Sequence, residues 1–304
     1  MGPLKGIKIL EFAGIGPGPF CGMLLADLGA EVIKISRPDS KGNGSKYDLN
    51  DRSKFSITLD LKNDESINEL KKLIGQVDAV FEGFRPGVME KLGLGPNDLL
   101  SINEKLVYGR MTGWGQEGLF SDMAGHDLNY LSITGALNAI GRKDERPPVP
   151  LNLIADYGGG GMLLAVGMLS ALIHSQKTGK GQVVDAAMID GTSMLMSLFY
   201  SFYGSGVWIN ERESNLLDGA AHFYDTYECK DGKYIAVACI EDKFYKEMLD
   251  KLEITDEKFS KQFSKDIWPE LKSKLEEKFL SKNRDEWAMI FKNSDACVLS
   301  LIHI

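Results

Sequence analysis

The opening of the chain constrains the fold more than any other stretch, because it predicts a strand, a turn, a helix and a second strand in quick succession. Residues 7–13 (IKILEFA) have the apolar character of a buried strand, and the turn GIGPGP follows at 14–19. We predict an apolar helix at about 20–28 and a second strand within GAEVIKIS at 29–36. Such a unit predicts two parallel strands joined by a right-handed crossover.

The same alternation of strands and helices continues to about residue 115. Residues 64–75 have helical periodicity, with acidic residues at the start and basic residues in the middle. Strands are predicted at 78–84 and 105–113, and a helix that begins with proline is predicted between them at 86–94. The sequence therefore predicts an α/β fold with a parallel sheet.

The rest of the chain has a different character, which predicts a domain boundary. Up to residue 217 the pattern is mainly helical, and from residue 218 it becomes a hairpin turned at 230–232 followed by charged helices. We therefore predict a large domain at 1–217 and a smaller α+β domain at 218–304. The remaining predicted elements are helices at 126–140, after Asp156, at 190–204, 243–252, 267–280 and 283–292, and strands at 181–188 and in the final stretch DACVLSLIHI.

Bulk composition excludes several classes of function. The net charge of −8 argues against a nucleic-acid binder, since phosphate backbones need a basic face. The four cysteines have neither a CxxC pair nor a ligand-like spacing, so we expect neither a zinc site nor a disulfide framework. The apolar run at 157–173 is barely long enough to span a membrane, and its glycines favour a buried, closely packed helix instead.

The glycine-rich turn does not form a standard dinucleotide loop. A GxGxxG match fails, because its sixth position is Pro19 when counted from Gly14 and Cys21 when counted from Gly16. After the second strand, Arg37 stands where an NAD enzyme would carry an acidic ribose ligand. A guanidinium there suits a phosphorylated ribose, as in NADP or coenzyme A, although a solvated arginine is an equal alternative. Other cations that could bind phosphate are Arg52, Lys54, Lys62 and Arg85.

Three further side chains are candidates for acid–base chemistry. Asp156 precedes four successive glycines, 158–161, each of which costs a helix about 1 kcal/mol relative to alanine. Either another chain segment or a ligand must therefore approach this backbone closely, and Asp156 is either a helix cap or a reactive carboxylate. His126 is either structural or half of a catalytic pair, and Glu241, after the apolar segment 234–240, is either a solvated strand end or the orienting partner of a histidine.

Taken together, these residues lie within motifs that resemble the family III CoA-transferases, and the resemblance extends over residues 3–298. The motifs are LKGIKILEFAGIGPGPFCGMLLADLGAEVIKISRP, LDLK, FRPGVMEKLGLGP, GRMTGWGQEG, AGHDLNYL, PLNLIADYGGGG, GKGQVVDAAMIDGTS and DGKYIAVACIEDKFY. Within that family they are similar to the branch that inverts the α-carbon of 2-methyl-branched acyl-CoA thioesters.

The resemblance implies a Rossmann-like sheet in the large domain and a homodimer of two interlocked chains. It also implies an active site between the large domain of one subunit and the small domain of the other. His126 and Asp156 would be two bases on opposite faces of the α-carbon, exchanging its proton through an enolate, and Glu241 would orient His126. The substrate would be an acyl-CoA, so that coenzyme A is part of the substrate and no metal or redox cofactor is expected.

The resemblance also implies which residues contact the substrate. Met194 and Met196 are weaker candidates for the acyl tail, because methionine at helical spacing is more often core. Contacts to CoA and the acyl group are expected from Arg37, Leu59, Asp60, Leu61, Lys62, Glu82, Arg85, Gly125, Asp127, Leu128, Asn129 and Tyr130.

Alternatives remain open at this stage. In family members that move CoA between carboxylic acids, the aspartate at the position of Asp156 is a nucleophile that forms an anhydride. His126 and Glu241 favour proton transfer, because CoA transfer does not need a second base. A non-catalytic binding protein is a third possibility. The resemblance ends near residue 298, so we expect an incomplete C-terminus, and location in a peroxisome or mitochondrion, or in a bacterial cytoplasm, follows only by resemblance.

Overall fold

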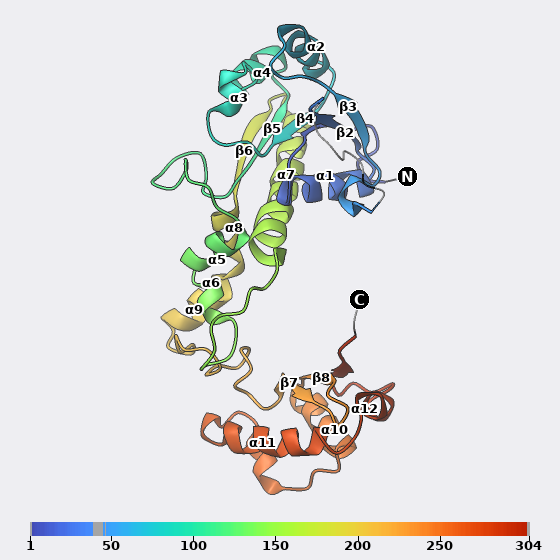
Figure 1. Cartoon of the computed structure of the whole chain (residues 1–304), viewed down its shortest axis with the longest axis vertical. Helices are drawn as coiled ribbons and strands as arrows, with labels where there is room; N and C mark the ends of the chain where they lie inside the picture. Colours follow the sequence, from blue (N-terminus) through green and yellow to red (C-terminus); the bar gives the residue numbers. More distant parts are fainter. Residues whose placement is uncertain (1, 39–44, 46, 303–304) are drawn as a thin grey trace. The chain divides into compact units, whose positions relative to one another are not determined.

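The strand, helix and strand that open the chain begin a six-stranded sheet (Figure 1). A computed structural model describes residues 2–38, 45 and 47–302. In it β1 (Lys8–Phe12) pairs in parallel with β2 (Glu31–Ser36), and α1 (Pro17–Asp27) connects them. The helix begins at Pro17 rather than near Phe20, because proline lacks an N–H and the first helical turn has no use for that donor.

The sheet is doubly wound, with the strand order β3-β2-β1-β4-β5-β6 and every neighbouring pair parallel. The order reverses between β1 and β4, so the loops that follow these two strands turn away from each other and leave a crevice between them. The predicted Rossmann-like parallel sheet is therefore confirmed. The other strands are β3 (Phe55–Thr58), β4 (Ala79–Glu82), β5 (Val107–Thr112) and β6 (Gln182–Ala187).

Each face of the sheet is covered by helices, because alternate strand residues point to opposite sides. On one face Ile9 packs with residues of α1 and of α7 (Leu163–Thr178). On the other face Leu10 and Tyr108 pack with α2 (Asp64–Ile74), α3 (Val88–Lys91) and α4 (Pro96–Ile102).

The helix predicted at 190–204 is two helices in the structure, α8 (Met188–Leu195) and α9 (Ser197–Gly204), and two other predicted helices differ because of left-handed glycines. The helix predicted at 86–94 is reduced to α3, because Gly87 before it has φ 79° and Gly93 after it has φ 65°. The helix predicted at 126–140 is divided into α5 (Asp127–Ile133) and α6 (Ala136–Ala139), because Gly135 has φ 79°.

The glycines after Asp156 lie in a π-helix, η2 (Leu153–Met162), which continues into α7. A Cβ on Gly159 would lie 2.7 Å from the backbone nitrogen of Thr192, in α8 (Met188–Leu195). A Cβ on Gly161 would lie 2.8 Å from the carbonyl oxygen of Pro17 in α1. Another chain segment therefore requires the close approach that the sequence predicted, since α1 and α8 both lie against η2.

The segment Leu153–Thr178 is long and apolar enough to cross a membrane by length and composition, with a mean hydropathy of 1.4. That value applies to an 18-residue stretch of the segment, and half of the stretch is buried inside the protein, where α7 packs on β5 and β6. The same length and composition occur in the core helices of soluble proteins, so this feature is weak evidence for a membrane span.

By its internal packing the chain divides into two compact units, 1–137 with 149–198 and 138–148 with 199–304. The second unit contains the predicted hairpin, β7 (Tyr224–Glu228) and β8 (Tyr234–Ala238), and β9 (Val298–Ser300) pairs with β8. The final strand is therefore confirmed up to Ser300, while His303 and Ile304 lie outside the described residues. The remaining elements are η1 (Leu49–Asp51) and α9 (Ser197–Gly204), and in the second unit α10 (Asp242–Lys251), η3 (Glu257–Lys261), η4 (Lys265–Ile267), α11 (Trp268–Phe279) and α12 (Arg284–Ile290).

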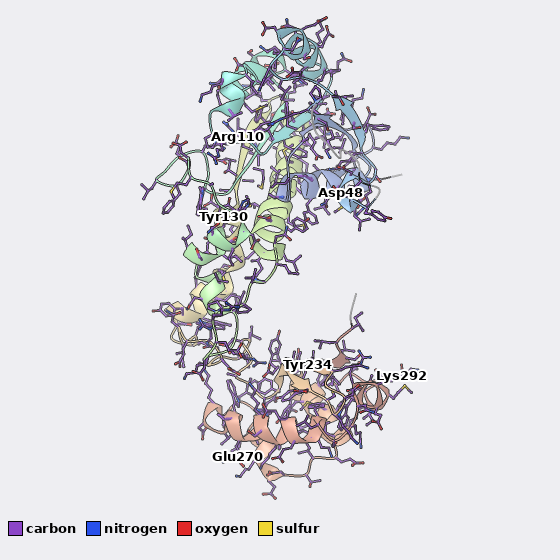
Figure 2. All side chains as sticks on the ribbon, viewed as in Figure 1. Asp48, Arg110, Tyr130, Tyr234, Glu270 and Lys292 are labelled. Atoms are coloured by element: carbon purple, nitrogen blue, oxygen red, sulfur yellow. The ribbon has the colours of Figure 1, made fainter. Side chains whose placement is uncertain are left out.

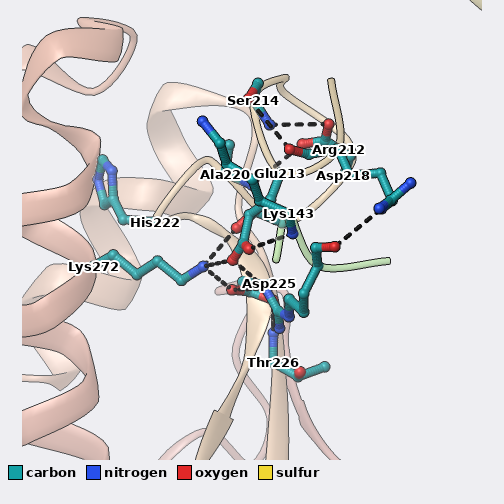
Figure 3. A network of polar contacts seen from close by, with 12 residues as sticks. Lys143, Arg212, Glu213, Ser214, Asp218, Ala220, His222, Asp225, Thr226 and Lys272 are labelled. Carbon is teal, nitrogen blue, oxygen red and sulfur yellow. Dashed lines mark hydrogen bonds and ion pairs between the residues drawn. The ribbon is translucent and has the colours of Figure 1, made fainter. Parts of the chain in front are cut away.

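A network of ion pairs joins residues 138–148 to the rest of the second unit (Figure 3). The Arg142 guanidinium contacts Asp225 at 2.7 Å and Glu213 at 2.8 Å. Lys272 on α11 contacts the same two carboxylates, each at 2.7 Å. The predicted domain boundary between residues 217 and 218 thus falls inside the second unit.

Candidate active site

A cavity of about 640 Å³ lies in the first unit, at the carboxyl ends of the parallel strands. This is the place where open α/β sheets bind ligands, because the loops after β1 and β4 diverge there. The loops after β1, β4 and β5 all contribute to its walls. The lining residues are 12–19, 81–86, 111–114, 121 and 123–126, with Arg37, Tyr130, Asn152, Asp156 and Met188.

His126 and Asp156, the two predicted bases, both line this cavity. His126 is the N-cap residue of α5 and is exposed, and its backbone N–H donates to Asn129 Oδ1 at 3.0 Å. Asp156 lies in the first turn of η2 and is half-buried. The structure therefore places an imidazole and a carboxylate in one cavity, as the resemblance implied.

The environment of Asp156 favours its protonated form. Burial raises the pKa of this carboxyl above its usual range, and the nearby charge of Asp127 acts in the same direction. A hydrogen bond from Asn152 Nδ2, at 3.3 Å, and the nearby His126 act in the opposite direction. Gly16 leaves room beside the carboxylate, since a Cβ there would lie 3.1 Å from Asp156 Oδ2.

Asp127 does not line the cavity as the described residues form it. Its side chain is buried, and Oδ2 accepts hydrogen bonds from the backbone N–H groups of Ala155 and Asp156, both at 2.8 Å. Nothing in the local sequence predicted this contact beyond helix capping, because the partners are distant along the chain.

Two of the cations expected to contact coenzyme A, Arg37 and Arg85, line the cavity. Arg37 follows β2 and lies over the ring of Phe84, 5.9 Å from its centroid. Arg85 follows β4 and is exposed. Both side chains are placed where a phosphorylated ligand could meet them, since they extend from loops at the carboxyl edge of the sheet.

Glu82 also lines the cavity, but its carboxylate is engaged by the protein. It accepts a hydrogen bond from the N–H of Phe84 at 2.6 Å and pairs with Arg110 at 3.3 Å. Burial raises the pKa of Glu82 to about 7. Figure 2 marks Arg110 on β5, where it also pairs with Glu90 at 2.8 Å. These contacts fix the loop that carries Phe84.

Several other predicted contacts do not line the cavity formed by the described residues. The turn after β3 is held to the end of β2 by a 2.9 Å hydrogen bond from Leu59 N to Ser36 O, and Asp60 Oδ1 caps Lys62 N at 3.0 Å. Arg52 and Lys54 are used within the fold, paired with Asp27 and Glu11 respectively. The predicted contacts outside the cavity wall are Leu59, Asp60, Leu61, Lys62, Asp127, Leu128 and Asn129, together with Met194 and Met196.

Glu241 belongs to the second unit, where it is the N-cap residue of α10 just beyond β8. Its carbonyl accepts hydrogen bonds from the N–H groups of Phe244 and Tyr245, at 3.0 and 2.9 Å. Its side chain is exposed, as expected for a residue that follows the end of a buried strand.

Sequence reasoning missed Trp114 in the cavity wall, although it predicted Tyr130 beside it. Trp114 and Tyr130 form an edge-to-face pair with centroids 4.7 Å apart, and the Trp114 indole donates to the Met123 carbonyl at 3.1 Å. Tyr130 donates to the Gly125 carbonyl, and burial raises its pKa to about 12 (labelled in Figure 2). The glycines around Trp114 were the available signal. Among the described residues, no group of three or more His, Cys, Asp or Glu is placed to hold a metal ion.

Comparison with known proteins agrees with the family resemblance seen in the sequence motifs. A model of "CoA-transferase family III" matches residues 4–302. The chain is 44% identical to "Alpha-methylacyl-CoA racemase" of Mus musculus, over 98% of this chain and 77% of that protein. It is also 44% identical to the Homo sapiens protein of that name, over 98% and 78%. A crystal structure of Rv3272 from M. tuberculosis is 29% identical with a TM-score of 0.81, covering 99% of this chain and 84% of that one.

Proposed function

The chain belongs to CoA-transferase family III, and from that premise we propose that it inverts the α-carbon of 2-methyl-branched acyl-CoA thioesters. It is therefore an enzyme of the isomerase class, an α-methylacyl-CoA racemase in activity. The identity of 44% over nearly the whole chain to two proteins of that name supports this reading over CoA transfer. The family resemblance predicted from the motifs is confirmed.

One observation in the structure supports the reaction most strongly: His126 and Asp156 line the same cavity. A thioester already acidifies the proton on its α-carbon, so inversion needs one group to remove that proton and another to return one to the opposite face. Imidazole and carboxyl groups are the usual general acids and bases in enzymes. In our proposal His126 and Asp156 exchange these roles according to the configuration of the substrate.

The raised pKa of Asp156 fits this role. A carboxyl group of ordinary acidity would seldom be protonated near neutral pH, whereas one raised by burial more often holds the proton that it must return. Arg37 and Arg85 would hold the phosphates of coenzyme A, which is part of the substrate. We expect the reaction to need no metal or redox cofactor.

The partner of this chain in our proposal is a second copy of itself. Glu241 of one subunit would orient His126 of the other, as the family resemblance implies. Exposed apolar side chains on α7 are consistent with a contact surface, among them Val166 at 58% and Ile173 at 53% exposure. We further propose no nucleic-acid or membrane partner, and location in a peroxisome or mitochondrion remains a prediction.

Proton exchange in deuterated water tests the proposed function. Wild-type protein should introduce deuterium at the α-position of a 2-methylacyl-CoA of defined configuration and should form both epimers. His126→Ala should lower this rate by about 10²- to 10⁴-fold, because one positioned base is lost. Its binding of acyl-CoA, measured by calorimetry, should remain nearly intact. His174→Ala is the matched control, since His174 is exposed on α7 and absent from the cavity wall described.

The rival reaction is tested in the same samples. If His126→Ala incorporates deuterium at the wild-type rate, the assignment of two bases is wrong. If a second free carboxylic acid is added and a new thioester forms, Asp156 acts as a nucleophile and the protein transfers CoA.

A further inference from the structure

Asp127 makes a contact that the proposed reaction does not by itself require. In a π-helix each N–H bonds to the carbonyl five residues earlier, and the first such bond of η2 joins Tyr157 N to Asn152 O at 3.3 Å. The N–H groups before Tyr157 therefore have no carbonyl partner within the helix. The Asp127 carboxylate accepts two of them, those of Ala155 and Asp156, at 2.8 Å each.

These bonds connect the two predicted bases through a single side chain. Asp127 follows His126 directly and is the first residue of α5, so its backbone is continuous with that of His126. Its carboxylate meanwhile holds the backbone N–H of Asp156. With 6% exposure it is shielded from water, which strengthens hydrogen bonds to an ionised acceptor.

We infer that Asp127 is a positioning residue, which fixes the Asp156 backbone relative to His126 so that both bases reach the same α-carbon. This inference rests on the proposed function and replaces the predicted role of Asp127 as a substrate contact. A displacement of about 1 Å between reacting groups can cost on the order of 10²-fold in rate, so a rigid link between two bases has a direct catalytic effect.

The charge of Asp127 gives the link a second consequence. Burial raises the pKa of Asp156, and the neighbouring negative charge of Asp127 raises it further. The other carboxylate oxygen, Oδ1, is buried without a hydrogen-bond partner among the described residues. A neutral amide at this position could still accept both backbone N–H groups but would lose the charge, so geometry and charge can be separated by substitution.

Two substitutions carry out that separation. Asp127→Ala removes the acceptor, so the rate constant kcat for α-proton exchange should fall at least about 10-fold while KM changes less than about twofold. Asp127→Asn keeps the acceptor, so its kcat should fall less. In the pH–rate profile of this variant, the limb that reflects ionisation of Asp156 should move to lower pH. Loss of the neighbouring negative charge favours ionisation of the Asp156 carboxyl group. Asp98→Asn, an exposed change on α4, should move neither quantity.

Carbon-13 NMR of labelled aspartate provides a measurement that does not depend on turnover. The signal of Asp156, assigned by its loss in Asp156→Asn, should titrate at lower pH in Asp127→Asn than in the wild type. An unchanged titration would overturn the inference, as would Asp127→Ala with raised KM and unchanged kcat, which indicates a substrate contact. Failure of the wild type to exchange α-protons would instead overturn the proposed function, while the NMR titration would still decide the role of Asp127.

Discussion

At the scale of single residues, the structure distinguishes histidines that look alike in the sequence. His126 caps α5 and faces the cavity, whereas His222 is fully buried in the core of the second unit. The Nε2 of His222 lies 2.7 Å from the Tyr245 hydroxyl, and burial lowers its pKa to about 4. A histidine in such a place is neutral at physiological pH and contributes to stability rather than to chemistry.

The burial of His222 predicts how stability depends on pH. Its pKa is about 4 when folded and near 6.5 when unfolded, so below pH 6.5 the unfolded state takes up the proton first. Stability is therefore fully present above pH 6.5 and is lost progressively down to about pH 4. The loss should total roughly 3 kcal/mol, at about 1.4 kcal/mol per pKa unit. His222→Gln should flatten this pH dependence in urea denaturation followed between pH 4 and 7.

The exposed His174 supplies the control for that measurement. His174→Gln also removes one histidine, at an exposed position on α7, so the flattening should be specific to His222→Gln. Equal slopes for His222→Gln and wild type would show that His222 does not retain a depressed pKa in solution.

At the scale of elements, close packing of η2 against α8 requires glycine. A Cβ on Gly159 would lie 2.7 Å from the Thr192 backbone nitrogen, and a Cβ on Gly191 would lie 1.8 Å from the Gly159 carbonyl oxygen. Neither contact can be relieved by a side-chain rotation, because backbone atoms are on the opposing side. The position of Asp156 at the start of η2 therefore depends on residues with no chemistry of their own.

Substitution of this glycine should separate packing from helix propensity. Gly159→Ala should lower the free energy of unfolding by about 1–3 kcal/mol through overpacking, and should reduce α-proton exchange because η2 carries Asp156. Gly204→Ala, in α9 where nothing lies within 4 Å of the added methyl group, should lose no stability. If the two variants unfold at the same urea concentration, helix packing does not require Gly159.

The sequence predicted most of these elements but not the contacts between them. Apolar runs identified β1, β2, β4 and β5, because burial of parallel strands on both faces favours apolar residues at most of their positions. Gly135 and Gly93 divided or shortened predicted helices, since a left-handed glycine ends a helix without changing the apolar pattern. The bond from Asp127 to Asp156 could not be predicted, because local sequence does not show which buried N–H groups lack partners.

At the scale of the whole molecule, the division into units depends on contacts distant in sequence. Arg142 joins residues 138–148 to Asp225 in the second unit, across a separation of 83 residues. A change in composition near residue 218 predicted a domain boundary, but composition does not show which segment an arginine pairs with. The family resemblance added what neither composition nor periodicity contains, namely an assembly of two chains and a role for Glu241.

That assembly predicts complementation between inactive subunits. If each site combines His126 of one chain with Glu241 of the other, a heterodimer of His126→Ala and Glu241→Ala chains has one site with both residues intact. Random pairing makes half of the dimers mixed, each with one of two sites intact, so co-expression should restore about one quarter of wild-type activity.

Co-expression of Glu241→Ala with Asp242→Ala, a neighbouring exposed residue, controls for stabilisation by dimerisation alone. It should reach about one half if Asp242 is dispensable, since the quarter of dimers that are Asp242→Ala homodimers keep both sites and each mixed dimer keeps one. Activity of the His126→Ala and Glu241→Ala mixture no greater than the sum of the separate variants would show that both residues act within a single chain, or that Glu241 does not act on His126 at all.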